Sequence, residues 1–182
     1  MANPKSAYSV STKKEKSDTH IIVVWVDNEA GVLARVVGLF SGRGYNIESL
    51  AVAEVDAKRN ISRITIVTTG PPQVIDQIKL QLKKLVPVHK VADFKRNDKS
   101  VIFKEMALFK IVGNTNKIKK AIKFCKKFNP VVLDKTNKSV VIQITALRRE
   151  IDTIMNDLKK TGLVSVSRTG AVAMTRGAEV FK

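Results

Sequence analysis

The chain has 182 residues, of which 44% are hydrophobic and 27% charged, which is typical of a globular protein and not of a disordered or collagen-like one. Its longest apolar run, residues 21–26, is far shorter than the roughly 20 residues that span a bilayer, and its single cysteine excludes an intramolecular disulfide. The net charge of +17 is concentrated in residues 98–182, which carry +11, and this leaves nucleic acid or an acidic protein open as partners.

Residues 1–19 are polar and rich in Lys, Ser and Thr. They lack the apolar core of a secretory signal peptide. We therefore expect a flexible N-terminal tail on a cytoplasmic protein.

Residues 20–95 predict one βαββαβ unit. A buried strand over 20–26 precedes a helix that opens at Gly31, and strands follow over 47–55 and 62–68. A second helix and a strand over 86–94 complete the unit. The two helices are indicated by apolar residues three and four positions apart: Leu33, Val36, Val37 and Phe40 in the first, and Ile75, Ile78, Leu82 and Leu85 in the second.

The same order recurs over residues 105–170, after a polar linker at 96–104. Strands are expected over 106–112, 131–134, 139–145 and 164–167, and we expect residues 171–182 to form a C-terminal tail. Two helices on one face of a four-stranded antiparallel sheet define the ferredoxin-like arrangement. The predicted fold class is α+β, with two tandem ferredoxin-like units. The apolar positions that indicate the helices of this unit are Ile118, Ile122 and Cys125, then Ile151, Ile154 and Leu158.

The residues that most often carry catalysis or bind metal are few and scattered. His20 and His89 keep no metal-ligand spacing with another His or Cys, so we predict no metal site. Cys125 lies on the apolar side of its predicted helix, without a nearby base, and is expected to be buried rather than nucleophilic.

The junction between the first strand and the first helix, residues 27–33, is the segment of the sequence that could bind a ligand. The first N–H groups of a helix lack intrahelical partners and make that end electropositive, so a free carboxylate fits there. Gly31 permits close approach to the backbone, and Asn28 offers an amide beside it. The alternative is that Asn28 only caps the helix and Gly31 only serves the turn.

Residues 26–36 resemble the signature loop of ACT domains, which bind amino acids. Residues 38–50, with the block Arg43-Gly44-Tyr45-Asn46-Ile47-Glu48-Ser49, closely resemble the small regulatory subunits of acetohydroxyacid synthase (acetolactate synthase). The resemblance covers about residues 20–177 and includes the segments 104–108 and 166–170.

This resemblance implies a subunit with no catalytic residue and no cofactor of its own. It would activate a catalytic subunit that carries thiamine diphosphate, Mg²⁺ and FAD, and confer feedback inhibition by valine in branched-chain amino acid synthesis. The ACT domains would pair as a homodimer, without nucleic acid or membrane as a partner. The effector would lie between the loop of one copy and the second strand of the other, on Asn28, Ala30, Gly31 and Val32 and on Asn46 and Ile47.

Three other functions are compatible with parts of the sequence. The ferredoxin-like order also occurs in RNA-binding modules that stack bases on central-strand aromatics, but the strands taken as central, 47–55, 62–68, 131–134 and 139–145, contain none, and the lysines between 117 and 127 are expected to form a solvated helix face. An enzyme could use Glu48 and Glu54, although no His or Lys stands beside them. An ACT sensor could also serve some other pathway enzyme.

Overall fold

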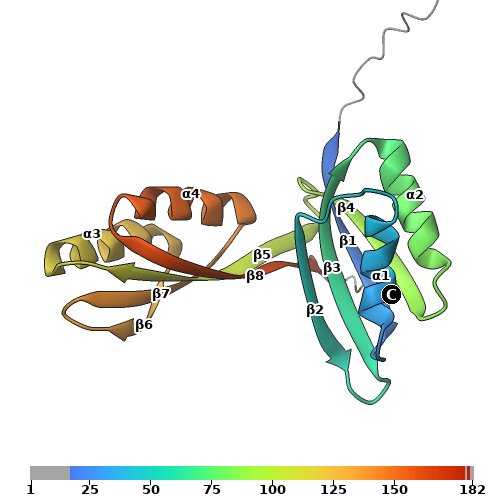
Figure 1. Ribbon diagram of the computed structural model, residues 1–182, viewed down its shortest axis with the longest axis horizontal. Helices are drawn as coiled ribbons and strands as arrows, with labels where there is room; N and C mark the ends of the chain where they lie inside the picture. The colour runs from blue at the N-terminus through green and yellow to red at the C-terminus, as the bar shows by residue number, and fades with distance from the viewer. Residues whose placement is uncertain (1–16, 179, 181–182) are drawn as a thin grey trace, which may run out of the picture.

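The computed structural model describes residues 17–178 and residue 180, so most of the expected N-terminal tail lies outside the described residues. Two βαββαβ units follow one another along the chain (Figure 1). No helix among the described residues has the length and apolarity needed to cross a membrane. The first unit consists of β1 (Asp18–Asp27), α1 (Val32–Ser41), β2 (Ser49–Asp56), β3 (Ile61–Gly70), α2 (Pro72–Lys83) and β4 (Val88–Lys95). The second consists of β5 (Val101–Val112), α3 (Thr115–Cys125), the 3₁₀ turn η1 (Lys126–Phe128), β6 (Val131–Lys135), β7 (Ser139–Ala146), α4 (Arg148–Lys159) and β8 (Leu163–Thr175).

The first sheet is antiparallel, with the strand order β2-β3-β1-β4. Successive side chains of a strand point to opposite faces, so Ile22 and Val24 of β1 lie on one face, opposite Ile66 and Ile64 of β3. The apolar sides of α1 and α2 cover this face and close a core whose side chains are almost inaccessible to solvent. The fold class predicted from the sequence is confirmed for this unit.

The second sheet repeats the pattern, with the order β6-β7-β5-β8 and helices α3 and α4 on one face. Cys125 is fully buried in this core, as predicted, and burial raises the pKa of its thiol to about 11. The lysines of α3 and η1 are exposed on the opposite side of the helix, which confirms the solvated face: Lys117, Lys119, Lys120, Lys123, Lys126 and Lys127.

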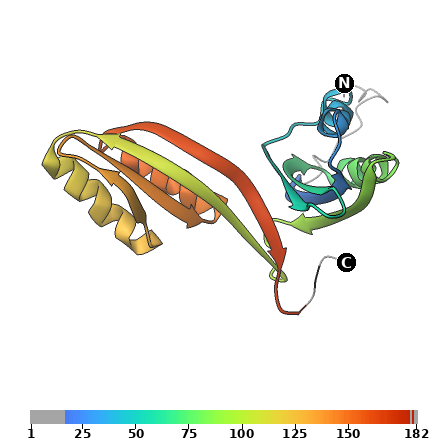
Figure 2. The same ribbon diagram turned by 90° about the horizontal axis from the view of Figure 1, so that it is seen from below.

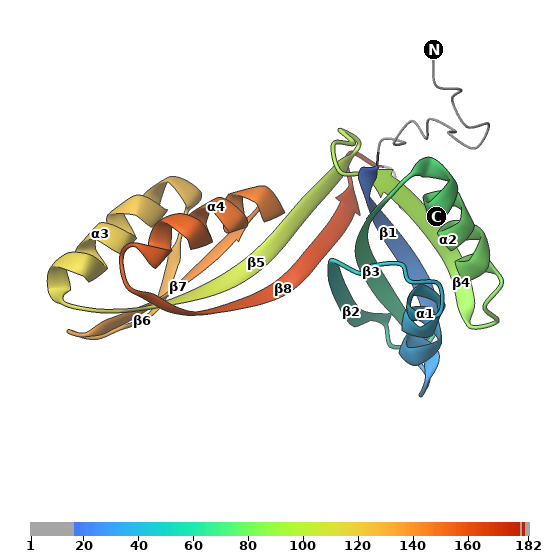
Figure 3. The ribbon, with the colours of Figure 1, turned by 45° about the horizontal axis from the view of Figure 1, so that its top comes forward.

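The two units are joined by a third apolar cluster on the face of the first sheet that the helices leave uncovered. Ile21 and Val23 of β1 pack there against Val101 of β5 and against Ala171 and Ala173 of β8. Figures 2 and 3 show β5 and β8 leaving the second unit as a long two-stranded ribbon whose far end lies against the first sheet. Both faces of the first sheet are therefore in contact with other elements.

This ribbon corrects the predicted boundaries. β5 begins at Val101, inside the segment expected to be a linker over 96–104, and β8 continues to Thr175, inside the expected tail at 171–182. Residues 101–105 and 171–175 pair with one another in the β5–β8 ladder and bury apolar side chains on the first sheet. That burial depends on a surface far away in sequence, which explains why local patterning placed the strand ends too close to the second core.

The position of β2 is also corrected. This strand begins at Ser49, two residues later than expected, and lies at the edge of its sheet, whereas β1 and β3 are the central strands. The edge position follows from the ferredoxin-like crossover, which inserts β3 between β1 and β2. Likewise β6 is an edge strand, and β5 and β7 are central in the second sheet.

Candidate effector site

The turn between β1 and α1 is built around a left-handed glycine. Gly31 is the N-cap of α1 with φ 81° and ψ −8°, a left-handed backbone conformation that residues other than glycine rarely adopt. Its carbonyl accepts the N–H of Arg35 at 3.0 Å, and Val32, only 3% exposed, anchors the first turn in the core. Ala30 and Gly31 are exposed, so a ligand can approach the helix start from solvent.

Asn28 is held in place from the β2–β3 turn and from β3. Its N–H donates to the carbonyl of Asn60 at 2.7 Å, its carbonyl accepts from Asn60 Nδ2 at 3.2 Å, and its Oδ1 accepts from Ser62 Oγ at 3.0 Å. Helix α1 has no side-chain cap. The alternative that Asn28 serves as the helix cap is therefore wrong, and its amide is oriented by β3 instead.

Asn46 and Ile47 lie in the connection between α1 and β2, and not within the strand as expected. The carbonyl of Asn46 accepts from Thr68 Oγ1 at 2.7 Å, while its side chain is exposed. Ile47 is half-buried against the core of the first unit. The segment is anchored again by Glu48, whose N–H donates to the carbonyl of Val67 at 2.8 Å.

The predicted site residues form two groups that one chain does not bring together. Asn28, Ala30, Gly31 and Val32 are at or just before the start of α1, and Asn46 and Ile47 follow its end. A helix of 10 residues separates the groups, which corresponds to about 15 Å at 1.5 Å per residue. A ligand of amino-acid size cannot touch both groups in one protomer.

The edge strand β2 borders the first sheet on this side, and β8 contacts only its start, where Ser49 Oγ accepts from the N–H of Ala171 at 3.3 Å. Residues 52–55 are exposed, including Val52 at 46%, and Leu33 on α1 is 39% exposed. An edge strand carries unpaired backbone groups that can pair with another strand. The arrangement can therefore extend its sheet across a second copy of the chain and bring the start of one α1 towards the 46–47 segment of the other.

The strand order also changes the comparison with RNA-binding modules. Trp25 lies on the central strand β1, on the face away from the helices, so the expectation that the central strands contain no aromatic residue is wrong. However, Arg63 and Lys90 lie over its ring at 5.2 and 5.8 Å, and Arg63 donates to the carbonyl of Ala173 in β8. Because β8 packs on this face, Trp25 is not an open platform for bases.

The carboxylates considered for catalysis are engaged in structural contacts. Glu48 lies outside β2, accepts from Thr69 Oγ1 and pairs with Arg148 at 3.8 Å. Glu54 is exposed on the edge strand, within a register irregularity of the β2–β3 ladder. The described residues thus do not bring Glu48 and Glu54 together as an acid–base pair.

Comparison with known proteins gives a family match for each of the two units. Residues 22–90 match the family model of the AHAS small subunit-like ACT domain, and residues 104–177 match that of the small subunit of acetolactate synthase. The acetolactate synthase small subunit of Haemophilus influenzae is 38% identical over 161 residues, which cover 86% of this chain and 95% of the relative. The chain belongs to the acetolactate synthase small subunit family.

Other members of the small subunit family match this chain over a similar length. The small subunit of Buchnera aphidicola is 37% identical over 155 residues, covering 85% of this chain and 96% of that protein. The crystal structure of the acetolactate synthase small subunit from Thermotoga maritima superposes with a TM-score of 0.80 at 31% identity, covering 88% of this chain and 99% of that one. The family resemblance seen in the sequence is confirmed, and the loop 28–32 and the 46–47 segment both lie within the matched ACT domain.

Proposed function

We propose that this chain is the regulatory subunit of a two-component acetolactate synthase. It has no active site of its own, binds the catalytic subunit, raises its activity and makes it sensitive to valine. The observation that carries the proposal is membership in the small subunit family over both units of the chain. The separation of the two groups of site residues along α1 supports an effector site that needs two copies.

The effector's carboxylate would lie at the start of α1, near the N–H of Gly31 and near that of Val32, which in the single chain donates to the carbonyl of Glu29 at 3.3 Å. The positive end of a helix favours an anion there by roughly 0.3–2 kcal/mol, and the left-handed glycine leaves the approach open: a Cβ added to Gly31 would meet nothing within 4 Å. The ammonium would be accepted by amide oxygens. Asn28 Oδ1 uses one acceptor direction for Ser62 and keeps another, and Asn46 is exposed on the partner copy.

The aliphatic side chain of the effector would rest between Ala30 of one copy and Ile47 of the other. One methylene in such a contact changes affinity by about 1–3 kcal/mol, so leucine and isoleucine would bind more weakly than valine. A coupling free energy of about 1–3 kcal/mol between the effector and the assembly is typical of allosteric control. Valine would therefore inhibit by preferring one arrangement of the paired ACT domains.

The homodimer would form through the edges of the first sheets. Pairing two β2 strands would satisfy their free backbone groups and cover the exposed apolar side chains of Leu33 and Val52. The catalytic subunit would supply the reaction chemistry with thiamine diphosphate, Mg²⁺ and FAD.

Co-expression with the catalytic subunit tests this function. The chain should co-purify with it, acetolactate formation from pyruvate should rise, and valine should inhibit the complex but not the catalytic subunit alone. Sedimentation of the regulatory chain should give a dimer. A chain that neither co-purifies nor changes the rate would contradict the proposal and favour a sensor for another enzyme.

A further inference from the structure

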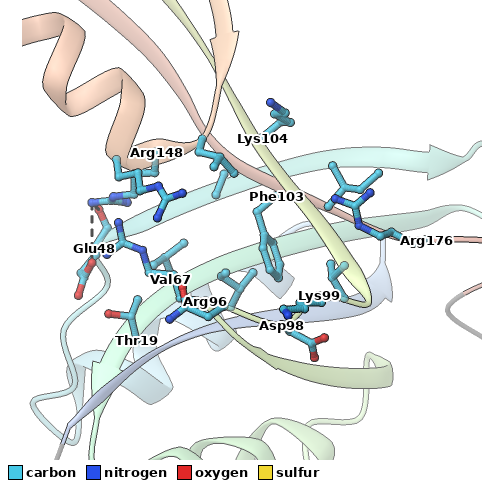
Figure 4. A pocket seen from close by; sticks show the side chains of 17 residues that line it. Thr19, Glu48, Val67, Arg96, Asp98, Lys99, Phe103, Lys104, Arg148 and Arg176 are labelled. Carbon is cyan, nitrogen blue, oxygen red and sulfur yellow. Dashed lines mark hydrogen bonds and ion pairs between the residues drawn. The ribbon is translucent and has the colours of Figure 1, made fainter.

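A cavity lies in the cleft where the β5–β8 ribbon meets the first sheet, and none of the predicted effector residues lines it (Figure 4). Its volume is about 530 Å³, within the range of roughly 300–1,000 Å³ found for small-molecule sites, which often lie at such boundaries between units. Its walls come from β1, β3, the β4–β5 connection, β5, β8 and the start of α4. It therefore exists only because the two units pack together.

The charge of the cleft is strongly unbalanced. Two acidic side chains, Glu48 and Asp98, face six basic ones: Arg96, Lys99, Lys104, Arg148, Arg149 and Arg176.

Both acids are already engaged within the fold. Glu48 pairs with Arg148 and accepts from Thr69, and Asp98 accepts from the backbone N–H and hydroxyl of Ser100 at 2.8 and 2.6 Å. These two bonds lower the pKa of Asp98, so it stays ionised in this role. Within the described part of the chain, the other five basic side chains form no ion pair. Like charges gathered in a partly enclosed cleft repel one another and favour a bound anion.

The floor of the cleft is apolar. Ile21 and Val67 of the first sheet and Val101 and Ala171 of the ribbon are nearly buried, and Phe103 points into the space above them (Figure 4). In the same view Arg96 and Arg148 lie on one side of Phe103 and Arg176 on the other. A ligand that fits must combine an apolar body with negative charge.

We propose that this cleft binds a small organic dianion, in which a phosphate or a pair of carboxylates is joined to an apolar body. The anionic group would lie beside Arg96 and Arg148 or, on the other side of Phe103, beside Arg176, and the apolar body would contact Phe103 and Val67. This inference stands apart from the proposed valine response, because it concerns different residues and is measured on the regulatory chain alone.

Calorimetric titration of the full chain with 1-naphthyl phosphate and with naphthalene-2,3-dicarboxylate tests the proposal and distinguishes the two anionic groups. At least one should bind saturably, with one site per chain, and more weakly at high KCl. Neutral 1-naphthol and inorganic phosphate should each bind at least about tenfold more weakly, because 1-naphthol lacks the anionic group and inorganic phosphate lacks the apolar body. Absence of binding by both dianions, or equal binding of 1-naphthol, would overturn the proposal.

A charge-matched pair of variants locates the site. The double variant Arg96→Gln/Arg176→Gln should lose affinity by about tenfold or more, since it removes one basic contact on each side of Phe103. Lys119→Gln/Lys123→Gln removes the same charge from the exposed face of α3 and should bind like the parent. All four side chains are exposed, so both proteins should keep the parental melting temperature. An equal loss in both variants, or none in the first, would show that the cleft is not the site.

Discussion

Glu105 on β5 and Arg168 on β8 form a two-point ion pair in the second unit. Arg168 Nε donates to Glu105 Oε1 at 2.6 Å and its Nη2 to Oε2 at 2.8 Å, while Nη1 donates to Asp152 Oδ1 of α4 at 2.7 Å. Glu105 is 2% exposed, and the bonds from Glu105 hold the pKa of Arg168 well above its usual value. The pair lies where the β5–β8 register shifts, and through Asp152 it also ties the ribbon to α4.

Glu105→Gln should destabilise the protein strongly. The substitution removes the charge that compensates a guanidinium only 25% exposed. Breaking a fully buried pair costs about 3–5 kcal/mol, and partial exposure of Arg168 reduces this to about 2–4 kcal/mol. The matched control is Asp152→Asn, which removes the 44% exposed partner and should cost less than about 1 kcal/mol. Urea denaturation measures both, and equal losses would mean that Glu105 has no special role.

Gly170→Ala should loosen the contact between the two units. Gly170 has φ 81°, and a Cβ there would lie 2.8 Å from Ser49 Oγ and 3.3 Å from the carbonyl of Leu50. Gly177→Ala is the control, since Gly177 has a similar φ of 70° but nothing within 4 Å. Left-handed strain alone costs about 1–2 kcal/mol in both variants, so Gly170→Ala should melt at a lower temperature than Gly177→Ala. Equal melting temperatures would contradict the close approach of β8 to β2.

Gly31→Asp should abolish inhibition of the reconstituted enzyme by valine. Its fixed carboxylate would occupy the place proposed for the ligand's carboxylate, and space is available because nothing lies within 4 Å of the added Cβ. Activation of the catalytic subunit should persist. Gly177→Asp, at a comparable left-handed position in the second unit, should respond to valine as the parent does. A Gly31→Asp enzyme that is inhibited normally would place the effector elsewhere.

Asn46→His should weaken valine binding by crowding the same pocket from the partner copy. The backbone carbonyl of this residue would still accept from Thr68, so the local fold should survive. Calorimetric titration of the variant with valine should show an affinity at least about tenfold lower than that of the parent. Asn137→His, in the exposed β6–β7 turn, serves as the control. Parental affinity in Asn46→His would argue against a site shared between two copies.

Cys125 should make stability fall in alkaline solution. Burial raises the pKa of its thiol from 9.0 to about 11 in the folded chain, because the thiolate is disfavoured without water. Between these values the unfolded chain releases a proton that the folded chain keeps, so this contribution is complete below pH 9 and is lost as pH rises towards 11. Urea midpoints across this range should fall less in Cys125→Ala than in the parent. Parallel curves would show that the thiol is not responsible.

The same burial predicts slow chemical modification. At pH 8 a thiol-specific disulfide reagent should react with Cys125 only after the second core opens, because the side chain is fully buried among Phe109, Ile142 and Ile154. Rapid reaction of the folded protein would contradict this packing.

The sequence by itself determined the two βαββαβ units, their helices and the family. Those features depend on periodic apolar residues such as Ile75, Ile78 and Leu82, and on the Gly31 turn, all of which are local in the chain. Only the tertiary structure decided that β2 is an edge strand, that Asn28 is held by Ser62, and that residues 101–104 and 171–175 belong to the ribbon. It also brought Glu105 and Arg168 together as an ion pair and formed the cleft between the two units that basic side chains line. The physical reason is distance along the chain. A helix or strand shows its buried face in the spacing of its own apolar residues, whereas contacts between residues 34 to 63 or more positions apart leave no periodic pattern in either segment.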